Sequence, residues 1–346
     1  MTGPSAATAA VRLALRHALC DLPTTSPVAA AVSGGADSLA LAVALAFVRP
    51  GSGAWVVDHG LQDGSREVAD RAAEQCRSLG LTAEVLRAGP GSGQPGGGEG
   101  RRSSTAGGSS PEGRMRGAGP EARARAVRYT ALDEAAERLG AQVVLLGHTL
   151  DDQAETVLLG LARGSGARAL AGMSAQVGRY RRPLLELTRA TTRTACSDAD
   201  LVPWTDPHNA DPAFARARVR THVLPVLERA LGPGVAQALA RSARQAREDA
   251  DALDALAPST DEVAVLAALP TALRSRALKR WAELACGHGL TSAHVDALRD
   301  LVEHWHGQGP VTLPGGVRAG RAEGRLVALP AEHRDVRPEG RSRTGR

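Results

Sequence analysis

Two glycines, two hydroxyl side chains and a carboxylate stand together in the run Ser33-Gly34-Gly35-Ala36-Asp37-Ser38. The apolar run Val28–Val32 before it predicts a buried strand, and Leu39–Leu45 after it predicts a helix. At such a junction the free N–H groups of the first helical turn and the helix dipole attract anions. The glycines let the backbone curl around a phosphate, the serines add donors, and Asp37 could hold a Mg²⁺ ion. We interpret the run as a phosphate-binding loop; a plain tight turn before a capped helix is the simpler alternative.

A second dense cluster is the run His148-Thr149-Leu150-Asp151-Asp152-Gln153-Ala154-Glu155-Thr156. On a helix, spacings of three and four residues would place its histidine and three acids, His148, Asp151, Asp152 and Glu155, on one face. Clustered carboxylates suit a substrate that bears an amine, because they bind the cation and one can accept the proton that the amine loses before attack. The pattern from Thr149 to Asp152 also fits a capping box, so a plain helix start is the alternative. A metal-dependent phosphohydrolase would need more histidines at ligand spacing.

The elements that must position these clusters follow an alternating pattern. Between residues 27 and 187, strand and helix patterns alternate, which predicts a doubly wound, Rossmann-like parallel sheet with helices on both faces. The expected strands are 28–32, 54–57, 82–86 and 143–146, and the expected helices are 37–48, 65–79, 121–139 and 151–161. Ligands of such sheets bind beyond the carboxyl ends of the strands. The loop at 33–38, Asp58-His59-Gly60 and Gly147-His148 are therefore expected to share one edge.

The rest of the chain predicts further parts. Residues 88–120 and 331–346 are polar and aperiodic, and we expect both to be disordered. The expected organisation is an N-terminal helical segment (1–26), a catalytic domain (27–213) containing the 88–120 insertion, a basic helical linker (214–258), a small α+β C-terminal domain (262–330) and the tail (331–346). The small domain should hold helices over 270–285 and 292–305 and strand-like ends over 311–313 and 326–329.

Composition narrows the class of protein. The formal net charge is +5, but much of it lies in the two segments expected to be disordered, so bulk charge does not indicate nucleic acid. The four cysteines are far apart and form no C-x-x-C pair, which argues against a zinc ribbon, an iron–sulfur cluster or a disulfide scaffold and fits a reducing cytoplasm. No apolar run reaches the ~18 residues of a membrane span, and the N-terminus lacks a signal-peptide pattern. We expect a cytoplasmic protein that does not use a membrane.

Arginines supply the local positive charge. Arg163-Gly164 follows the acidic helix, and its glycine would allow a ligand to approach closely. A plain helix end is the alternative interpretation. Arg216, Arg218 and Arg220 alternate near the expected domain junction, and Arg241, Arg244 and Arg247 share a later helical face. A solvated helix is the alternative for these six, and a surface that tracks phosphates is the functional interpretation.

Taken together, these motifs resemble the tRNA(Ile)-lysidine synthases of the PP-loop ATP pyrophosphatase superfamily. SGGADS lacks the Lys-Ser/Thr ending of a Walker loop and resembles the loop of enzymes that split ATP between its α and β phosphates. The motifs that carry the resemblance are SGGADS (33–38), VDHGLQDGS (57–65), EARARAVRY (121–129), GHTLDDQAET (147–156), RGSG (163–166), RPLL (182–185) and DPHNADPAFARARVRTHVLP (206–225). Ala217 departs from the asparagine usual in the last motif, and the 88–120 insertion has no counterpart.

The resemblance implies a reaction and its partners. ATP would adenylate the C2 oxygen of the wobble cytidine in an isoleucine tRNA with a CAU anticodon, and the ε-amine of free L-lysine would displace AMP. The implied cofactors are ATP and Mg²⁺, and a homodimer is one of the oligomeric states that remain open.

Positions that match the family motifs receive roles by the same resemblance. The nucleotide would contact Ser33, Gly34, Gly35, Ala36, Asp37, Ser38, Asp58, His59, Arg163 and Gly164, with Asp37 also on Mg²⁺. The catalytic group would be Asp37, His148, Asp152 and Glu155, and the tRNA would contact Arg125, Arg128, Arg216, Arg218 and Arg220. Helical geometry puts Arg218 opposite Arg216 and Arg220, and we expect Arg218 to face the nucleotide and the other two the tRNA.

Two other functions fit parts of the sequence. A sulfur-inserting tRNA enzyme of the same ATP class would need a pair of reactive or cluster-binding cysteines, and none of the four stands in a strand-end motif. A non-catalytic nucleotide-binding module would not need the acidic cluster.

Overall fold

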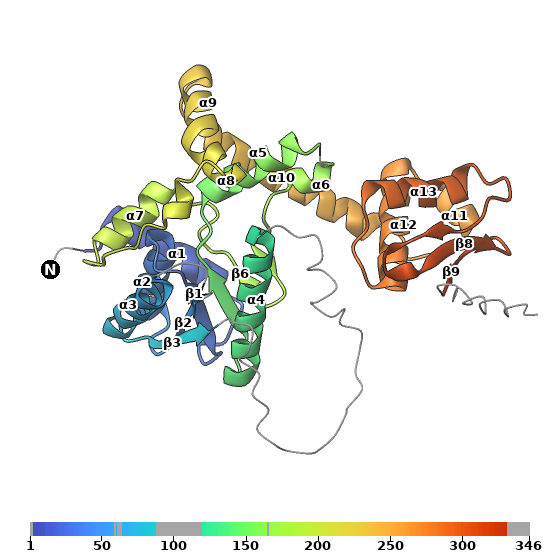
Figure 1. The fold of residues 1–346 in the computed structure, drawn as a ribbon. Helices are drawn as coiled ribbons and strands as arrows, with labels where there is room; N and C mark the ends of the chain where they lie inside the picture. The colour runs from blue at the N-terminus through green and yellow to red at the C-terminus, as the bar shows by residue number, and fades with distance from the viewer. Residues whose placement is uncertain (1–2, 59, 61–63, 88–119, 165, 331–346) are drawn as a thin grey trace, which may run out of the picture. The chain divides into compact units, whose positions relative to one another are not determined.

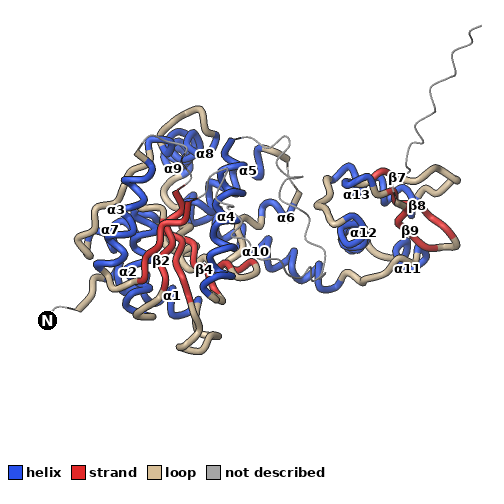
Figure 2. Tube along the Cα trace, turned by 60° about the horizontal axis from the view of Figure 1, so that its bottom comes forward, coloured by secondary structure: helices blue, strands red, loops and turns tan. Residues whose placement is uncertain are grey.

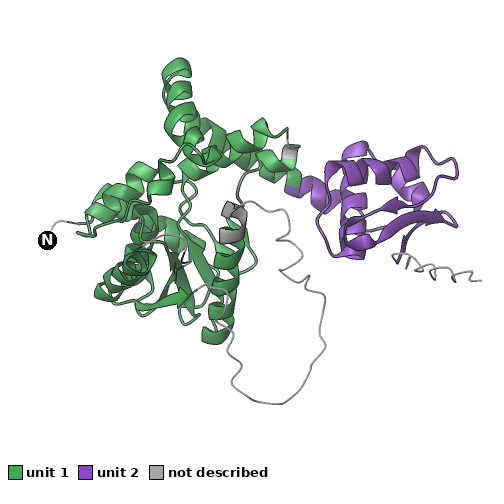
Figure 3. Cartoon of the chain, viewed as in Figure 1, with its two compact units in different colours: residues 1–100, 114–250 green, residues 101–113, 251–346 purple. Residues whose placement is uncertain are grey.

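The computed structural model describes residues 3–58, 60, 64–87, 120–164 and 166–330. His59, residues 88–119 of the expected insertion and the tail 331–346 lie outside this part of the chain. The chain divides into two compact units, which meet in sequence between residues 250 and 251 (Figure 3). The expected linker 214–258 is therefore shared, since its residues up to 250 belong to the first unit.

The first unit is built on a six-stranded sheet in the order β3-β2-β1-β4-β6-β5 (Figures 1 and 2). All neighbouring strands are parallel except the pair β5–β6. The strands are β1 (Val28–Val32), β2 (Gly53–Asp58), β3 (Thr82–Arg87), β4 (Val143–Leu146), β5 (Gln176–Val177) and β6 (Tyr180–Arg181). The four long strands confirm the predicted ones, and the order confirms the doubly wound parallel fold.

Helices cover both faces of this sheet because strand residues alternate between two apolar cores. Val28, Ala30 and Val32 of β1 pack into a core with helices α1, α2, α3 and α7. Ala29 of β1 packs on the other face against helix α4. The helices of this unit are α1 (Ala6–Ala18), α2 (Ala36–Val48), α3 (Ser65–Ser78), α4 (Pro120–Leu139), α5 (Leu150–Ala162), α6 (Ala167–Leu170), α7 (Arg189–Ser197), the 3₁₀ turn η2 (Pro207–Asn209), α8 (Ala215–Arg218), the π-turn η3 (Val219–Val223), α9 (Leu224–Leu231) and the part of α10 (Val235–Leu256) up to residue 250.

Short-range signals place several helix ends. Gly80 and Gly140 have φ angles of 83° and 68°, which confirms that left-handed glycines follow α3 and α4. The predicted helical stretch from 214 is divided at Gly232, but Pro225 causes no break because it lies in the first turn of α9. The π-turn η3 lies between α8 and α9, and its first residue, Val219, and the first residue of α9, Leu224, are both buried against α5.

The second unit is a small α+β domain with its own apolar core, formed by Leu266, Leu278, Leu298 and their neighbours. Its helices are α11 (Val263–Ala268), α12 (Thr271–Cys286), α13 (Ser292–Glu303) and the 3₁₀ turn η4 (Pro314–Gly316); its antiparallel strands are β7 (Val311–Thr312), β8 (Arg318–Ala322) and β9 (Arg325–Leu329), in that order in the sheet. The sequence did not predict α11 or β8. In the described part of both units, no helix has the length and apolar character needed to cross a membrane.

Candidate active site

The loop at residues 33–38 forms a cradle at the end of β1. Gly34 has a φ of 80°, which glycine adopts without strain, and a side chain there would lie 3.3 Å from Ala72. Gly35 precedes α2 and brings no side chain to cap it, so the first-turn N–H groups have no side-chain cap. Ser38 Oγ donates to the Gly35 carbonyl at 2.8 Å and accepts from the Ser33 N–H at 3.1 Å. The loop is therefore closed on itself around a helix N-terminus that favours anions.

The end of β4 lies directly against this loop. A Cβ atom added to Gly147 would lie 3.1 Å from both the Cα and the backbone nitrogen of Ser38. The carboxyl ends of β1 and β4 thus meet, as the parallel sheet predicted, and only glycine fits between them without displacing the start of α2.

We expect Gly147→Ala to disturb the start of α2, because backbone atoms of a helix cannot move aside as a flexible side chain can. The overpacking should cost about 1–3 kcal/mol of stability. It should also slow the ATP-dependent release of pyrophosphate that the resemblance implies about tenfold, which corresponds to ~1.4 kcal/mol. Gly289→Ala is the matched control, because no atom lies within 4 Å of a Cβ added there. Unchanged pyrophosphate release in Gly147→Ala would show that the loop tolerates the displacement.

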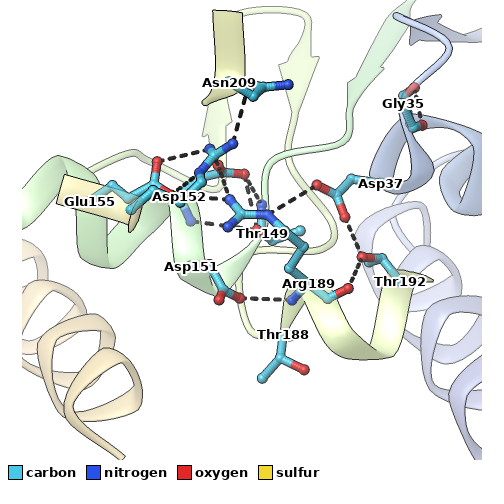
Figure 4. A network of polar contacts seen from close by, with 12 residues as sticks. Gly35, Asp37, Thr149, Asp151, Asp152, Glu155, Thr188, Arg189, Thr192 and Asn209 are labelled. Carbon is cyan, nitrogen blue, oxygen red and sulfur yellow. Dashed lines mark hydrogen bonds and ion pairs between the residues drawn. The ribbon is translucent and has the colours of Figure 1, made fainter. Parts of the chain in front are cut away.

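Asp37, in the first turn of α2, faces α7. Its carboxylate accepts a hydrogen bond from the Thr192 hydroxyl, and its Oδ2 lies 3.7 Å from Nε of Arg189 (Figure 4). Burial raises the pKa of the Asp37 carboxyl, although the bond from Thr192 and the charge of Arg189 act in the opposite direction. The carboxylate is thus held at the phosphate loop by a neighbouring helix.

The acidic cluster opens α5. Thr149 caps the helix in a capping box, in which its backbone N–H donates to Asp152 Oδ2 at 2.8 Å. The capping interpretation of Asp152 is therefore correct, and it coexists with a place in the cluster. Burial acts to raise the pKa of Asp152, but the positive charge of Arg189 and the other partners outweigh it and hold the pKa below its ordinary value. His148 precedes the helix, so the expectation that it shares the helical face is wrong.

Three arginines neutralise the carboxylates of α5. Glu155 is completely buried, and it accepts from Nε of Arg220 at 2.7 Å and from Nη2 of Arg189 at 3.2 Å. Nε of Arg216 lies 3.7 Å from its other oxygen. Arg220 also contacts Asp152 at 3.2 Å. A buried carboxylate of this kind needs such partners, because an unpaired buried charge is strongly destabilising.

The directions of the alternating arginines are the reverse of those expected. Arg216 and Arg220 point to the acids of α5, whereas Arg218 is exposed and donates to the carbonyl oxygens of Pro212 and Ala213 at 2.6 and 3.0 Å. Their opposite helical faces are confirmed. The side that meets α5 was assigned wrongly, because it depends on how the flanking apolar residues pack.

His148 lies at the edge of this group with its Nδ1 buried and without a hydrogen-bond partner in the described structure. Burial lowers its pKa to about 4, helped by the positive charges of Arg182, Arg125 and Arg216 and opposed by Asp152. A neutral imidazole with a free ring nitrogen can exchange a hydrogen bond or a proton with a bound group.

We expect His148 to remain neutral throughout pH 5–8. As the pH falls below its ordinary value of 6.5, His148 takes up a proton in the unfolded chain but not in the folded one until about pH 4. As the pH falls from 6.5 to about 4, the free energy of unfolding should therefore decrease by at most ~1.4 kcal/mol per pH unit. NMR titration of the His148 ring proton, with His148→Gln for assignment, tests this; a midpoint near 6.5 would contradict the buried arrangement.

The other candidate residues lie outside the contacts that join Asp37 to α5. Asp58 accepts from the Gly60 N–H at 3.0 Å and from the Ser65 hydroxyl at 2.7 Å, so it orders the turn after β2. Arg163 and Gly164 are exposed at the far end of α5, about 12 Å along the helix from Glu155. Exposed Arg125 and Arg128 lie on α4.

Sequence reasoning missed two members of the group, Arg189 and Thr192, because α7 itself was not predicted. The available signal was Thr188, which caps the helix through Thr191 and stands just before Arg189.

Known proteins resemble the chain over most of its length. Residues 9–227 match the PP-loop domain family, and residues 262–327 match the TilS substrate binding domain family. The tRNA(Ile)-lysidine synthase of Thermobifida fusca is 50% identical over 343 residues, which cover 94% of this chain and 99% of that protein. The protein of the same name from Leifsonia xyli is 51% identical over 317 residues, covering 86% and 88%. Among solved structures, a U34-tRNA thiolase from Methanococcus maripaludis shares the fold, with a TM-score of 0.53 at 18% identity over 69% of this chain and 79% of that one.

Proposed function

Because the chain belongs to the tRNA(Ile)-lysidine synthase family, we propose that it ligates free L-lysine to C2 of the wobble cytidine in an isoleucine tRNA with a CAU anticodon. In the first step the C2 oxygen attacks the α-phosphorus of ATP, a P–O bond forms and pyrophosphate leaves. In the second, the ε-amine of lysine attacks C2, the C–O bond breaks, AMP leaves and the amine loses a proton. The product is lysidine.

The cradle at 33–38 suits the phosphates of ATP. Its left-handed Gly34 and the uncapped N–H groups of α2 give the backbone donors that a polyphosphate needs. Asp37 is a carboxylate at the same helix start, which fits a Mg²⁺ ligand whose other ligands are phosphate oxygens and water. When bound, Mg²⁺ would neutralise charge on the phosphates as pyrophosphate leaves.

The observation that carries the proposal is the juxtaposition of Asp37 with the carboxylates of α5. Arg189 contacts Asp37 at 3.7 Å and Asp152 at 2.8 Å, so the phosphate-loop acid and the α5 acids share one contact group. Asp152 and Glu155 would receive the lysine amine, one of them taking its proton, and His148 would contact the adenylated cytidine. A non-catalytic nucleotide-binding module would not need Asp152 and Glu155 beside the phosphate loop.

The burial and the raised pKa values of the cysteines disfavour the alternative function, thiolation of a tRNA. The four cysteines are unpaired, and only Cys20 is exposed. Burial raises the pKa of the Cys76 thiol to about 11 and also raises that of Cys196. Buried, protonated thiols are poor nucleophiles and poor cluster ligands.

We expect Arg218→Ala to weaken tRNA binding while leaving the acid cluster intact, because its guanidinium is exposed and its contacts among the described residues are with backbone carbonyls. If Arg218 contacts one phosphate, the slope of log affinity against log salt should fall by somewhat under one unit. Arg66→Ala is the control, because Arg66 is also an exposed arginine but lies on a different helix, α3. An unchanged slope would remove Arg218 from the tRNA surface.

The function is tested by incubating the protein with labelled lysine, ATP, Mg²⁺ and an isoleucine tRNA transcript with a CAU anticodon. We expect label on the RNA together with AMP and pyrophosphate. A transcript that carries U at the wobble position is the matched control and should stay unlabelled. No label on the CAU transcript, or ADP as the main product, would overturn the proposal.

A further inference from the structure

Arg189 is the side chain that joins the two halves of the site. Its Nε atom lies 3.7 Å from a carboxylate oxygen of Asp37. Its Nη2 atom contacts Asp152 at 2.8 Å and Glu155 at 3.2 Å (Figure 4). The first acid lies in the first turn of α2, and the other two lie in the first two turns of α5. One cation therefore touches the carboxylate at the phosphate loop and both carboxylates at the amine site.

The backbone of α7 fixes this cation in place. The Arg189 N–H donates to Asp151 Oδ2 at 2.7 Å. The Thr192 hydroxyl, one turn later, shares its one hydrogen between the Asp37 carboxylate and the Arg189 carbonyl, which is 3.0 Å away. Buried Ala195 and Cys196 pack α7 into the core that it shares with α1 and α2. The tie to both carboxylate groups is thus part of a packed helix.

The other two arginines of the group differ from Arg189 in burial and in reach. The Arg189 side chain is 13% exposed, whereas those of Arg216 and Arg220 are 32% and 25% exposed. Among the described residues, Arg216 contacts Glu155 and Thr156, and Arg220 contacts Asp152, Glu155 and Asn209. Neither of these sets includes Asp37. The tie between the two halves therefore rests on Arg189.

Resting on the function proposed above, we propose that Arg189 is a positioning residue that holds the phosphate-loop acid and the two α5 acids in one electrically balanced unit. Without this guanidinium, Asp37 would lose its contact with the group, whereas Asp152 and Glu155 would still contact Arg220. Arg189 therefore sets the distance between the phosphate-loop acid and the two α5 acids. Adenylation and lysine transfer consequently depend on the same side chain.

The test compares Arg189→Ala, Arg189→Lys and Arg216→Ala in two assays. The first is tRNA-dependent pyrophosphate release without lysine, and the second is lysine transfer as a function of lysine concentration. We expect Arg189→Ala to slow pyrophosphate release and to raise the lysine KM, each about tenfold or more. Arg189→Lys, which keeps the positive charge, should restore part of both. Arg216→Ala should change the lysine KM alone.

Thr194→Ala, at an exposed position of α7 where the hydroxyl donates to the Ala190 carbonyl of the same helix, controls for damage to the helix and should alter neither assay beyond about twofold. The inference is overturned if Arg189→Ala affects only one step, if both rates fall only in proportion to the folded fraction, or if Arg189→Lys restores neither. Those outcomes leave the proposed function intact when the wild-type protein labels the tRNA. Absence of labelling by the wild type overturns both.

Discussion

Replacing Asp37 by Asn is expected to slow turnover roughly 10²-fold or more, the scale of losing a group that stabilises charge in the transition state. The carboxylate lies in the first turn of α2, beside the uncapped N–H groups, and its neighbours Thr192 and Arg189 hold it there. Asparagine keeps the shape of the side chain but loses the charge that a Mg²⁺ ion needs. The loss should therefore be chemical, with little change in folding.

Turnover and Mg²⁺ dependence measure this effect. We expect Asp37→Asn to require more Mg²⁺ and to release AMP and pyrophosphate slowly, with an unchanged melting temperature within a few degrees. Asp70→Asn, which removes the charge of an exposed aspartate on α3, is the matched control and should behave as wild type. Near-normal turnover of Asp37→Asn at low Mg²⁺ would remove Asp37 from the metal site.

The second large effect is expected from Glu155→Gln, which should raise the lysine concentration needed for transfer roughly 10²-fold while ATP binding stays nearly normal. Glu155 is completely buried, and its oxygens accept from Arg189 and Arg220. Glutamine would place an NH₂ group, a donor, against these guanidinium donors. It would also remove the negative charge that pairs with them. Charged hydrogen bonds are each worth about 1.5–3 kcal/mol, which accounts for an effect of this size.

Stability must be followed in the same variant. Removing one partner of a buried ion pair costs about 3–5 kcal/mol, but Arg216 and Arg220 are partly exposed and can turn to solvent. We therefore expect a loss at or below the lower end of that range. Glu186→Gln, which breaks the exposed pair with Arg244, is the control. If ATP binding collapses in Glu155→Gln while lysine dependence is unchanged, the two sites have been assigned the wrong way round.

The parts of the fold that follow local rules could be predicted from the sequence. Apolar runs such as Val28–Val32 and glycines such as Gly140 mark strands and helix ends within a few residues, and the structure has them there. The phosphate loop was recognisable for the same reason, because its chemistry is contiguous. The strand β8 was missed because Arg318–Ala322 shows no alternation of apolar and polar residues, and its pairing with β9 defines it.

The candidate site could be predicted only as far as its residues are close in sequence. Asp152 and Glu155 stand on one helix turn, whereas Arg189 contacts Asp37 across 152 positions and Glu155 across 34. Nothing local marks such a partner. The predicted direction of Arg216 and Arg220 was wrong for a related reason. The burial of Val219 against α5 decides which face of the segment turns inward.

The π-turn at Val219–Val223 makes the length of this segment matter. In a regular α-helix, the five-residue step from Val219 to Leu224 would rotate the chain about 500°, leaving the two side chains about 140° apart. The i→i+5 pattern brings them to one side, and both are buried beside Ala154. Losing one residue between Arg216 and Leu224 would turn α9 by about 100° relative to α5. We therefore expect that an insertion or deletion here must preserve the helical phase, whereas a loop would tolerate a change of length.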